Sequence, residues 1–199
     1  MAITTFATLK TYLAAASDRT DLTSCMGDFV RRAHDIIVTE VVISSDLTVD
    51  AASETLPTDF RVAQAVTIDA WPRVVLTASN ADQMENYGTG VPSLYRVSSQ
   101  TIYFAPTPDE TYYAKVLYKC ARTAFSADAD YNTILTRYPF VYVWGALAEL
   151  FSYILDTENA ALNEQKFRAE IARINAIETE DALNGPLQVT PGTSYGIAV

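Results

Sequence analysis

The spacing of apolar residues changes twice along this chain. Between residues 6 and 40 they recur every three or four positions, between 41 and 127 they alternate with polar residues, and after residue 139 the helical spacing returns. The first spacing is typical of an amphipathic helix, and the second is typical of a strand with one buried face. The sequence therefore predicts an α+β fold: a bundle of about four helices, a small antiparallel β-sheet inserted between the second and third helices, and an extended C-terminal tail.

The helices are expected at about residues 5–17, 22–40, 139–155 and 158–183. Thr4 or Thr5 can accept a hydrogen bond from the first free amides of the first helix, and Pro139 suits the first turn of the third. The third helix has the widest apolar stripe, which predicts that it forms the centre of the core. The stripe consists of Phe140, Val143, Trp144, Leu147, Leu150, Phe151 and Ile154.

The β-rich insertion is expected at about residues 41–127, with its clearest strand at Tyr112 to Cys120. There Ala114, Val116, Tyr118 and Cys120 share one face, which is predicted to pack against the core while the other face stays in water. Shorter candidate strands are Leu47 to Asp50, Ala63 to Asp69, Arg73 to Thr77, Leu94 to Val97 and Thr101 to Phe104.

Residues 1–183 are interpreted as a single domain and residues 184–199 as a tail, because the last segment contains glycines and prolines without a sustained period. A tail of this kind is either a frayed end or an arm that docks on a partner. The candidate docking residues are Pro186, Leu187, Val189, Tyr195, Ile197 and Val199.

The last helix carries charged residues at pairing distances. These are Glu164 with Arg168, Lys166 with Glu170, and Glu170 with Arg173. This polar face is a solvated surface by default, and the same pattern suits contact with a neighbouring subunit.

Charge and composition exclude several classes of protein. The chain has 199 residues, 14 basic and 24 acidic side chains, and a net charge of −10, with no run rich in lysine or arginine. The attraction that supplies most affinity for a phosphate backbone is therefore missing, and sequence-specific DNA binding is not expected. Glu149 interrupts the longest apolar stretch, so no membrane span is expected, and Met1 to Thr5 has no export signal. Cys25 and Cys120 are expected to be reduced, buried thiols.

No motif for catalysis, a cofactor or a metal is complete. His34, the single histidine, is expected to be an ordinary surface or boundary residue beside the polar face of the second helix. Asp128, Asp130 and Asn132 imitate part of a calcium loop, but the glycine and the closing glutamate that such a loop needs are missing, so residues 126–132 are interpreted as a polar turn before the next helix. Gly88-Thr89-Gly90 does not continue into a nucleotide-binding fingerprint. We expect no cofactor and no enzymatic activity.

The order of several short segments resembles the tailed-bacteriophage head-to-tail adaptor family over about residues 4–182. The segments are Thr5-Phe6-Ala7-Thr8-Leu9-Lys10, Arg19-Thr20-Asp21-Leu22, Phe29-Val30, Leu56-Pro57-Thr58-Asp59-Phe60, Ile102-Tyr103-Phe104-Ala105-Pro106-Thr107-Pro108, Leu117-Tyr118-Lys119 and Thr133-Ile134-Leu135-Thr136-Arg137-Tyr138-Pro139. No fixed motif covers the tail.

The resemblance implies a structural protein of the virion neck, made in the cytoplasm of the bacterial host. Such a protein forms a ring, typically of twelve copies, below the portal and carries further neck or tail proteins. Its partners would be the portal protein, other copies of itself and a downstream neck or tail protein, with DNA only passing through the channel. The resemblance places the portal-docking arm at residues 184–199, and Glu164, Lys166, Arg168, Glu170 and Arg173 are the candidate subunit interface. Two alternatives remain open: another neck or tail-completion (stopper) protein, and a small-ligand-binding protein or enzyme.

Overall fold

The computed structural model describes residues 2–70, 72–85, 87–121 and 125–183. The helices are α1 (Phe6–Ser17), α2 (Met26–Glu40), α3 (Thr133–Arg137), α4 (Pro139–Tyr153) and α5 (Thr157–Leu183), with short 3-10 turns at Thr20–Leu22 and Asp82–Met84. The strands are β1 (Ile43–Val49), β2 (Ser53–Thr55), β3 (Phe60–Ile68), β4 (Val74–Val75), β5 (Thr77–Ala78), β6 (Leu94–Ser98), β7 (Thr101–Ala105) and β8 (Tyr112–Cys120). The α+β class and the position of the strands between the second and third long helices are as predicted.

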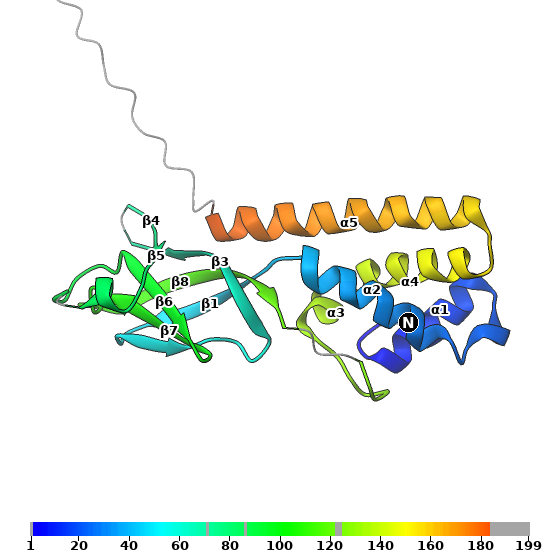
Figure 1. Cartoon of the computed structure of the whole chain (residues 1–199), viewed down its shortest axis with the longest axis horizontal. Helices are drawn as coiled ribbons and strands as arrows, with labels where there is room; N and C mark the ends of the chain where they lie inside the picture. Colours follow the sequence, from blue (N-terminus) through cyan, green and yellow to red (C-terminus); the bar gives the residue numbers. More distant parts are fainter. Residues whose placement is uncertain (1, 71, 86, 122–124, 184–199) are drawn as a thin grey trace, which may run out of the picture.

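The molecule is elongated, with α1 to α4 at one end, the strands at the other, and α5 running along the helices as far as the sheets (Figure 1). The second helix begins at Met26 rather than at Leu22, because residues 20–22 form a separate 3-10 turn. The short helix α3 was not predicted. Its single turn begins at Asn132, whose side chain accepts a hydrogen bond from the Leu135 amide at 2.7 Å.

The strands form two four-stranded sheets instead of the single sheet predicted. The first sheet has the order β1-β8-β3-β4 and is antiparallel throughout, and the second has the order β2-β7-β6-β5. In the second sheet β5 and β6 run parallel, which the prediction of an antiparallel sheet also missed. The division arises where the chain leaves the first sheet at Val49, the end of β1, and enters the second sheet at Ser53, the start of β2. The consecutive strands β1 and β2 are therefore not paired with each other.

The strand β8 lies at the centre of the first sheet, between β1 and β3. Its buried face contains Ala114, Val116, Tyr118 and Cys120, as the alternation predicts. Leu117 on the opposite face is buried too. The reason is that this face is not open to water along its whole length: α2 and α5 pack against it.

Two local features fix the start of α1 and the turn between β6 and β7. Thr5 and Thr8 form the capping box of α1. The side-chain oxygen of each accepts a hydrogen bond from the backbone amide of the other. Between β6 and β7 the two-residue turn at Ser99 and Gln100 has φ angles of 48° and 65°. Both values lie in the left-handed region that asparagine and glycine usually occupy in such hairpins.

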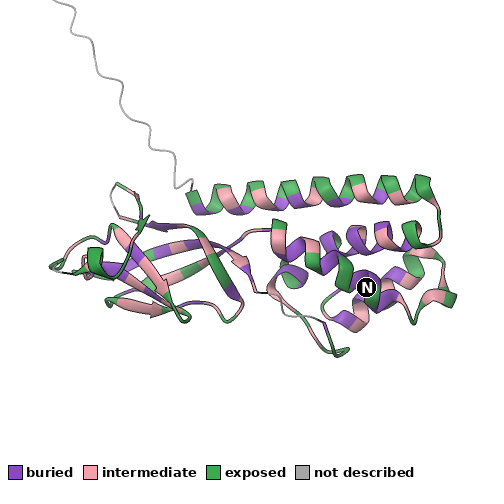
Figure 2. Cartoon of the chain, in the orientation of Figure 1, coloured by how far each residue is buried: buried purple, intermediate pink, exposed green. Residues whose placement is uncertain are grey.

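The helical core is centred on α4, which contacts α1, α2 and α5. Figure 2 shows the buried residues of α5 on the side that faces α4 and the exposed ones on the outside. The helices α2, α4 and α5 approach one another closely at Gly145 of α4. A Cβ atom on this residue would lie 2.8 Å from the Ala33 Cβ of α2 and 2.9 Å from the Phe167 ring of α5. A side chain at position 145 would therefore force the helices apart.

The predicted apolar stripe of α4 is correct only in part. Val143, Leu147 and Leu150 are buried, but Phe140 is 45% exposed, and Trp144, Phe151 and Ile154 are only partly buried. Because α1, α2 and α5 all pack against α4, its buried surface is wider than the predicted stripe and includes residues outside it. These are Val141, Tyr142, Gly145, Ala146 and Ala148.

Candidate partner-binding surfaces

The five residues predicted as a subunit interface lie on α5 outside its buried side. Phe167, Ile171 and Ile174 face the core, whereas the charged residues between them are exposed or half-buried. The predicted residues are Glu164, Lys166, Arg168, Glu170 and Arg173. The helix therefore presents them on the molecular surface.

Arg168 links α5 to the end of α2. Its Nη1 atom lies 2.7 and 2.8 Å from the two carboxylate oxygens of Glu40, and its Nε donates to Glu164 at 2.7 Å. These bonds raise the pKa of Arg168 above its ordinary value, with Glu40 the larger cause. Beside them the Asn175 amide donates to the Glu40 carbonyl and its oxygen accepts from the Val42 amide, each at 2.9 Å. Part of the predicted interface thus fastens α5 to its own subunit.

The other two basic residues of this face also have partners within the chain. Arg173 binds Glu170 at 2.6 Å, and its guanidinium lies 5.9 Å from the centre of the Tyr138 ring. The Lys166 ammonium group lies 4.7 Å from the centre of the Trp144 ring. A neighbouring subunit would therefore meet a surface whose charges are already largely balanced.

A buried carboxylate joins the C-terminal part of α5 to the first sheet. Glu178 is 3% exposed and accepts hydrogen bonds from the Ser44 amide at 2.7 Å, the Ser44 hydroxyl at 2.6 Å and the Tyr138 hydroxyl at 2.6 Å. Arg137 Nη1 lies 3.4 Å from the same carboxylate. Burial and the Glu178 contact raise the pKa of Tyr138 to about 12, so the phenol remains a donor at neutral pH.

Sequence reasoning missed Glu178, although a signal was present. Phe167, Ile171, Ile174, Glu178 and Ala182 follow one another at three- and four-residue spacing and are all buried. A charged residue in an apolar register is costly unless it is paired. Its position in that register therefore marked it as a structural contact.

A second carboxylate, Asp59, joins the loop before β3 to the start of α3. It accepts from the Thr133 hydroxyl at 2.6 Å and the Tyr118 hydroxyl at 3.0 Å, and the Cys120 thiol lies 3.7 Å away. Burial, together with Asp59, raises the pKa of Cys120 to about 12. The segment Leu56-Pro57-Thr58-Asp59-Phe60 was singled out by resemblance alone, and this contact gives it a physical role.

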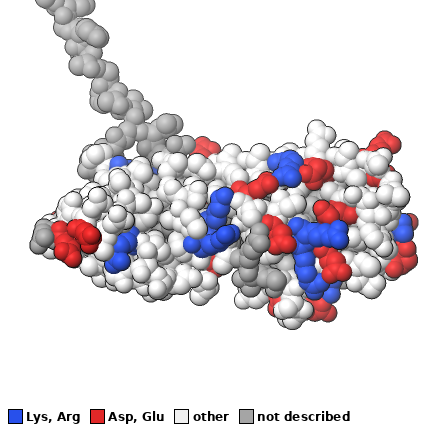
Figure 3. Space-filling view, in the orientation of Figure 1, with Lys and Arg blue, Asp and Glu red and all other residues white. Residues whose placement is uncertain are grey.

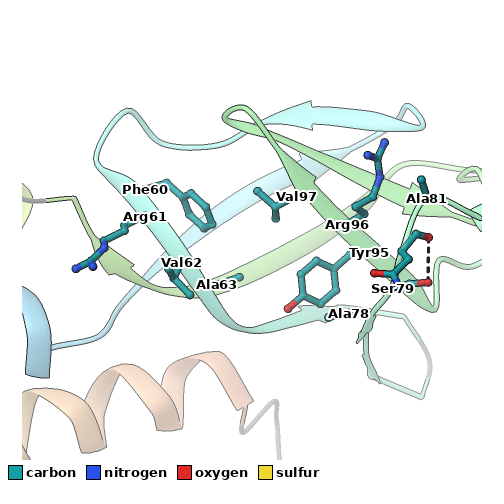
Figure 4. A pocket seen from close by; sticks show the side chains of 11 residues that line it. Phe60, Arg61, Val62, Ala63, Ala78, Ser79, Ala81, Tyr95, Arg96 and Val97 are labelled. Atoms are coloured by element: carbon teal, nitrogen blue, oxygen red, sulfur yellow. Dashed lines mark hydrogen bonds between the residues drawn. The ribbon is translucent and has the colours of Figure 1, made fainter. Parts of the chain in front are cut away.

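A cleft of about 560 Å³ opens between the two sheets (Figure 4). Phe60 and Ala63 of β3 line one side, and Tyr95 and Val97 of β6 line the other. Val62 lies at the border, because a bulge turns its side chain to the face of β3 that it shares with Lys119. The loop after β5, residues 79–81, lines its end. Polar and apolar atoms contribute about equally to its lining, which includes Arg61, Ser79 and Arg96.

An exposed apolar corner lies where α4 turns into α5. Tyr153 is 60% exposed, Leu155 84% and Leu162 46%. Leu155 also has a φ angle of 62°, in the left-handed region that disfavours large side chains. Figure 3 shows acidic and basic side chains interspersed over the helical end of the visible face, with a largely uncharged area between them and the opposite end.

The structure corrects the expectation for His34 and in part that for the thiols. His34 is 3% exposed rather than at the surface, because α2 packs it beside the Phe125 ring with its Nδ1 atom 2.9 Å from the Tyr142 hydroxyl. Cys120 is buried, but Cys25 is only partly so, because it lies at the start of α2. The turn before α3 is as predicted, with Asp130 accepting from the Ser126 and Ala127 amides.

Within the described ranges no group of three or more histidine, cysteine, aspartate or glutamate side chains could hold a metal ion. None of the helices described has both the length and the apolar character of a membrane span.

A sequence model of the SU10 adaptor protein family matches residues 4–190. The chain belongs to this family. It is therefore a phage head-to-tail adaptor, a structural protein of the neck, as the resemblance implied. No curated protein matches the chain.

The tail predicted to dock on the portal lies outside the residues that the structure describes. The match ends at residue 190 and so includes only the first part of this adaptor's tail. The helix α5 ends at Leu183, immediately before the tail. The carbonyl of Ala182 accepts a hydrogen bond from the Thr67 hydroxyl at 2.9 Å. The last turn of α5 therefore lies beside β3.

Proposed function

We propose that this adaptor forms a ring, of twelve copies, below the portal at the capsid vertex. The ring joins the capsid to the downstream neck or tail protein and surrounds the channel through which DNA leaves. The match to the adaptor family over residues 4–190 carries this proposal. The elongated subunit supports it, because side-by-side copies can use two different long surfaces, as closed rings with head-to-tail contacts require.

The net charge supports the role of the channel. Each subunit has a formal charge of −10, and the basic residues of the α5 face are bound to acids or aromatic rings of the same chain. Copies of such a subunit would repel the phosphate backbone rather than retain it. DNA would pass without sequence-specific contact.

The outer face of α5 is the proposed contact between neighbouring copies. Ala172 lies exposed on this face beside Arg173. Ala172→Arg adds bulk and charge at an exposed helical position, where stability is expected to change by less than about 0.5 kcal/mol. We expect the variant to fold normally and to fail to form the ring on purified portal, as seen by electron microscopy.

The matched control is Ala51→Arg, at an exposed position between β1 and β2. It makes the same chemical change away from α5 and should assemble as the natural chain does. A full ring formed by Ala172→Arg would exclude the α5 face as the subunit contact.

The tail is the proposed arm that docks on the portal, through Pro186, Leu187, Val189, Tyr195, Ile197 and Val199. Removal of residues 184–199 should leave the fold intact and reduce the amount of adaptor that co-purifies with portal. Particles whose neck remains fully occupied by the truncated chain would disprove this role of the tail.

A further inference from the structure

Two strands beside the cleft are paired along their whole length on one side and, among the described residues, along only part of their length on the other. The strand β3 pairs with β8 from Phe60 to Ile68, but β4 pairs with it only at Thr67 and Ile68. The stretch of β3 from residue 60 to residue 65 therefore has a free edge. Such an edge exposes a row of unpaired backbone donors and acceptors, which is a template for another strand.

The strand β6 has a similar free stretch. It pairs with β7 along its whole length, whereas β5 pairs with it only at Leu94 and Tyr95. Residues 96–98 are left without a neighbour on that side of the second sheet. Residues 60–63 of the first free stretch and 96–97 of the second line the same cleft (Figure 4).

The side chains of the cleft suit an extended segment with alternating character. Phe60, Ala63, Tyr95 and Val97 supply apolar contacts on the two sides. In a strand every second side chain points to the same side. A segment that pairs with β3 would therefore place alternate apolar residues against these residues and polar residues toward water.

The first part of the tail has this pattern. Leu187 and Val189 alternate with Gln188 and Thr190, and prolines stand at 186 and 191. Proline lacks an amide donor and is accepted at the ends of strands. Four residues between two prolines fit a free edge of six.

We propose that residues 187–190 of the tail bind as an added strand on the free edge of β3 in the same chain. The position of α5 supports this occupant, because Ala182 is hydrogen-bonded to Thr67 of β3. The four steps from Leu183 to Leu187 span at most about 14 Å, and the four steps from Thr67 back to Ala63 span about 13 Å of strand. Leu187 then lies opposite Ala63, and the segment runs antiparallel to β3.

The consequence for assembly rests on the proposed function of the tail. In the free adaptor the cleft holds part of the segment that the portal is proposed to bind. Portal and cleft therefore compete for Leu187 and Val189. Removal of the cleft contact should strengthen binding of the intact tail to the portal.

Hydrogen–deuterium exchange of the free protein tests the cleft contact. The full chain is compared with residues 1–183 and with the variant Leu187→Asp, Val189→Asp. We expect backbone amides of residues 61–65 to exchange at least about tenfold more slowly in the full chain than in either altered protein. Thr193→Asp, beyond Pro191, is the matched tail control and should retain the slow exchange.

A change in the cleft itself gives an independent measurement. Ala63→Asp places a charge opposite the proposed position of Leu187, at a residue that is only partly buried, so the fold should tolerate it. It should abolish the tail-dependent protection, whereas Val75→Asp, at an exposed position on β4, should not.

Equal exchange at residues 61–65 in the full and truncated chains would overturn the proposal. Protection that disappears on dilution would overturn it too, because it would mean that the tail binds another copy. Protection by the tail together with undiminished portal binding by residues 1–183 would leave the cleft contact intact and refute only the docking arm.

Discussion

The carboxylate of Glu178 accepts two hydrogen bonds from Ser44, one from its backbone amide at 2.7 Å and one from its hydroxyl at 2.6 Å. Residue 44 lies near the start of β1 and residue 178 lies near the end of α5. The pair joins the helical end of the subunit to the first sheet. Tyr138 adds a third donor from the start of α4.

Replacement of Glu178 by alanine should therefore be strongly destabilising. It leaves the Ser44 and Tyr138 donors without their acceptor in a buried site, for an expected loss of about 3 kcal/mol in the free energy of unfolding. Glu178→Gln retains an acceptor and should lose less. Urea denaturation measures both, with the exposed Glu180→Ala as control; similar losses at 178 and 180 would contradict the assignment.

Phe167 and Trp144 should differ in their contribution to stability. Phe167 is 1% exposed and packs against Gly145, so Phe167→Ala should cost about 3–5 kcal/mol. Trp144 is only half-buried, beneath Lys166, and its replacement by alanine should cost clearly less because less apolar surface leaves water on folding. Thermal unfolding of both variants compares the two costs. A larger loss of stability in Trp144→Ala than in Phe167→Ala would contradict the assignment of Phe167, rather than Trp144, to the core.

The two thiols should react differently with a thiol-specific reagent. Cys25 is partly exposed, whereas Cys120 is buried and its pKa is raised to about 12. Since the thiolate is the reacting species, the native protein should titrate one thiol and the denatured protein two. Cys25→Ser should show none in the native state; a reactive thiol in that variant would contradict the burial of Cys120.

Alkaline pH should weaken the fold through the same residue. The folded pKa of Cys120, about 12, lies above its ordinary value of 9.0. The unfolded chain therefore loses this proton first as the pH rises, and the stability contributed by the neutral thiol is present below pH 9 and is lost between about pH 9 and 12. Cys120→Ala should make the free energy of unfolding less dependent on pH in this range.

Leu155→Gly should stabilise the isolated protein. The residue occupies the left-handed position after α4, where the Asp156 amide bonds the Phe151 carbonyl at 2.9 Å, and glycine is the usual residue there. Relief of the backbone strain should add up to about 1 kcal/mol. Asp18→Gly, at the equivalent position of α1 with φ 52°, is the comparison and should gain less because aspartate tolerates this conformation. A loss of stability in Leu155→Gly would show that the leucine side chain makes a contact worth more than the strain.

The sequence was sufficient where a single periodicity ran long enough to be unambiguous. The long helices, the strand β8 and its buried face followed from spacing alone. The two-residue strands β4 and β5 are too short to carry a period, and their pairing depends on contacts distant in the sequence. The division into two sheets was missed for the same reason.

The side-chain contacts were harder to predict than the elements. His34 was assigned to the surface from the polarity of its neighbours, but the Phe125 and Tyr142 rings that enclose it lie 91 and 108 positions further along the chain. The charged pairs on α5 were predicted where both partners lie on the helix, as for Glu164 and Arg168. The Arg168 contact with Glu40 was not, since no local pattern reports it.

The fastening of α5 at successive points has a mechanical consequence. The helix is about 40 Å long, and Glu40, Ser44 and Thr67 hold it at intervals from Arg168, near its middle, to Ala182, near its end. A force applied at the helical end would therefore be transmitted along α5 to the sheets. Each subunit would then move as one rigid unit. In the proposed ring the channel could widen or narrow only if whole subunits tilted together.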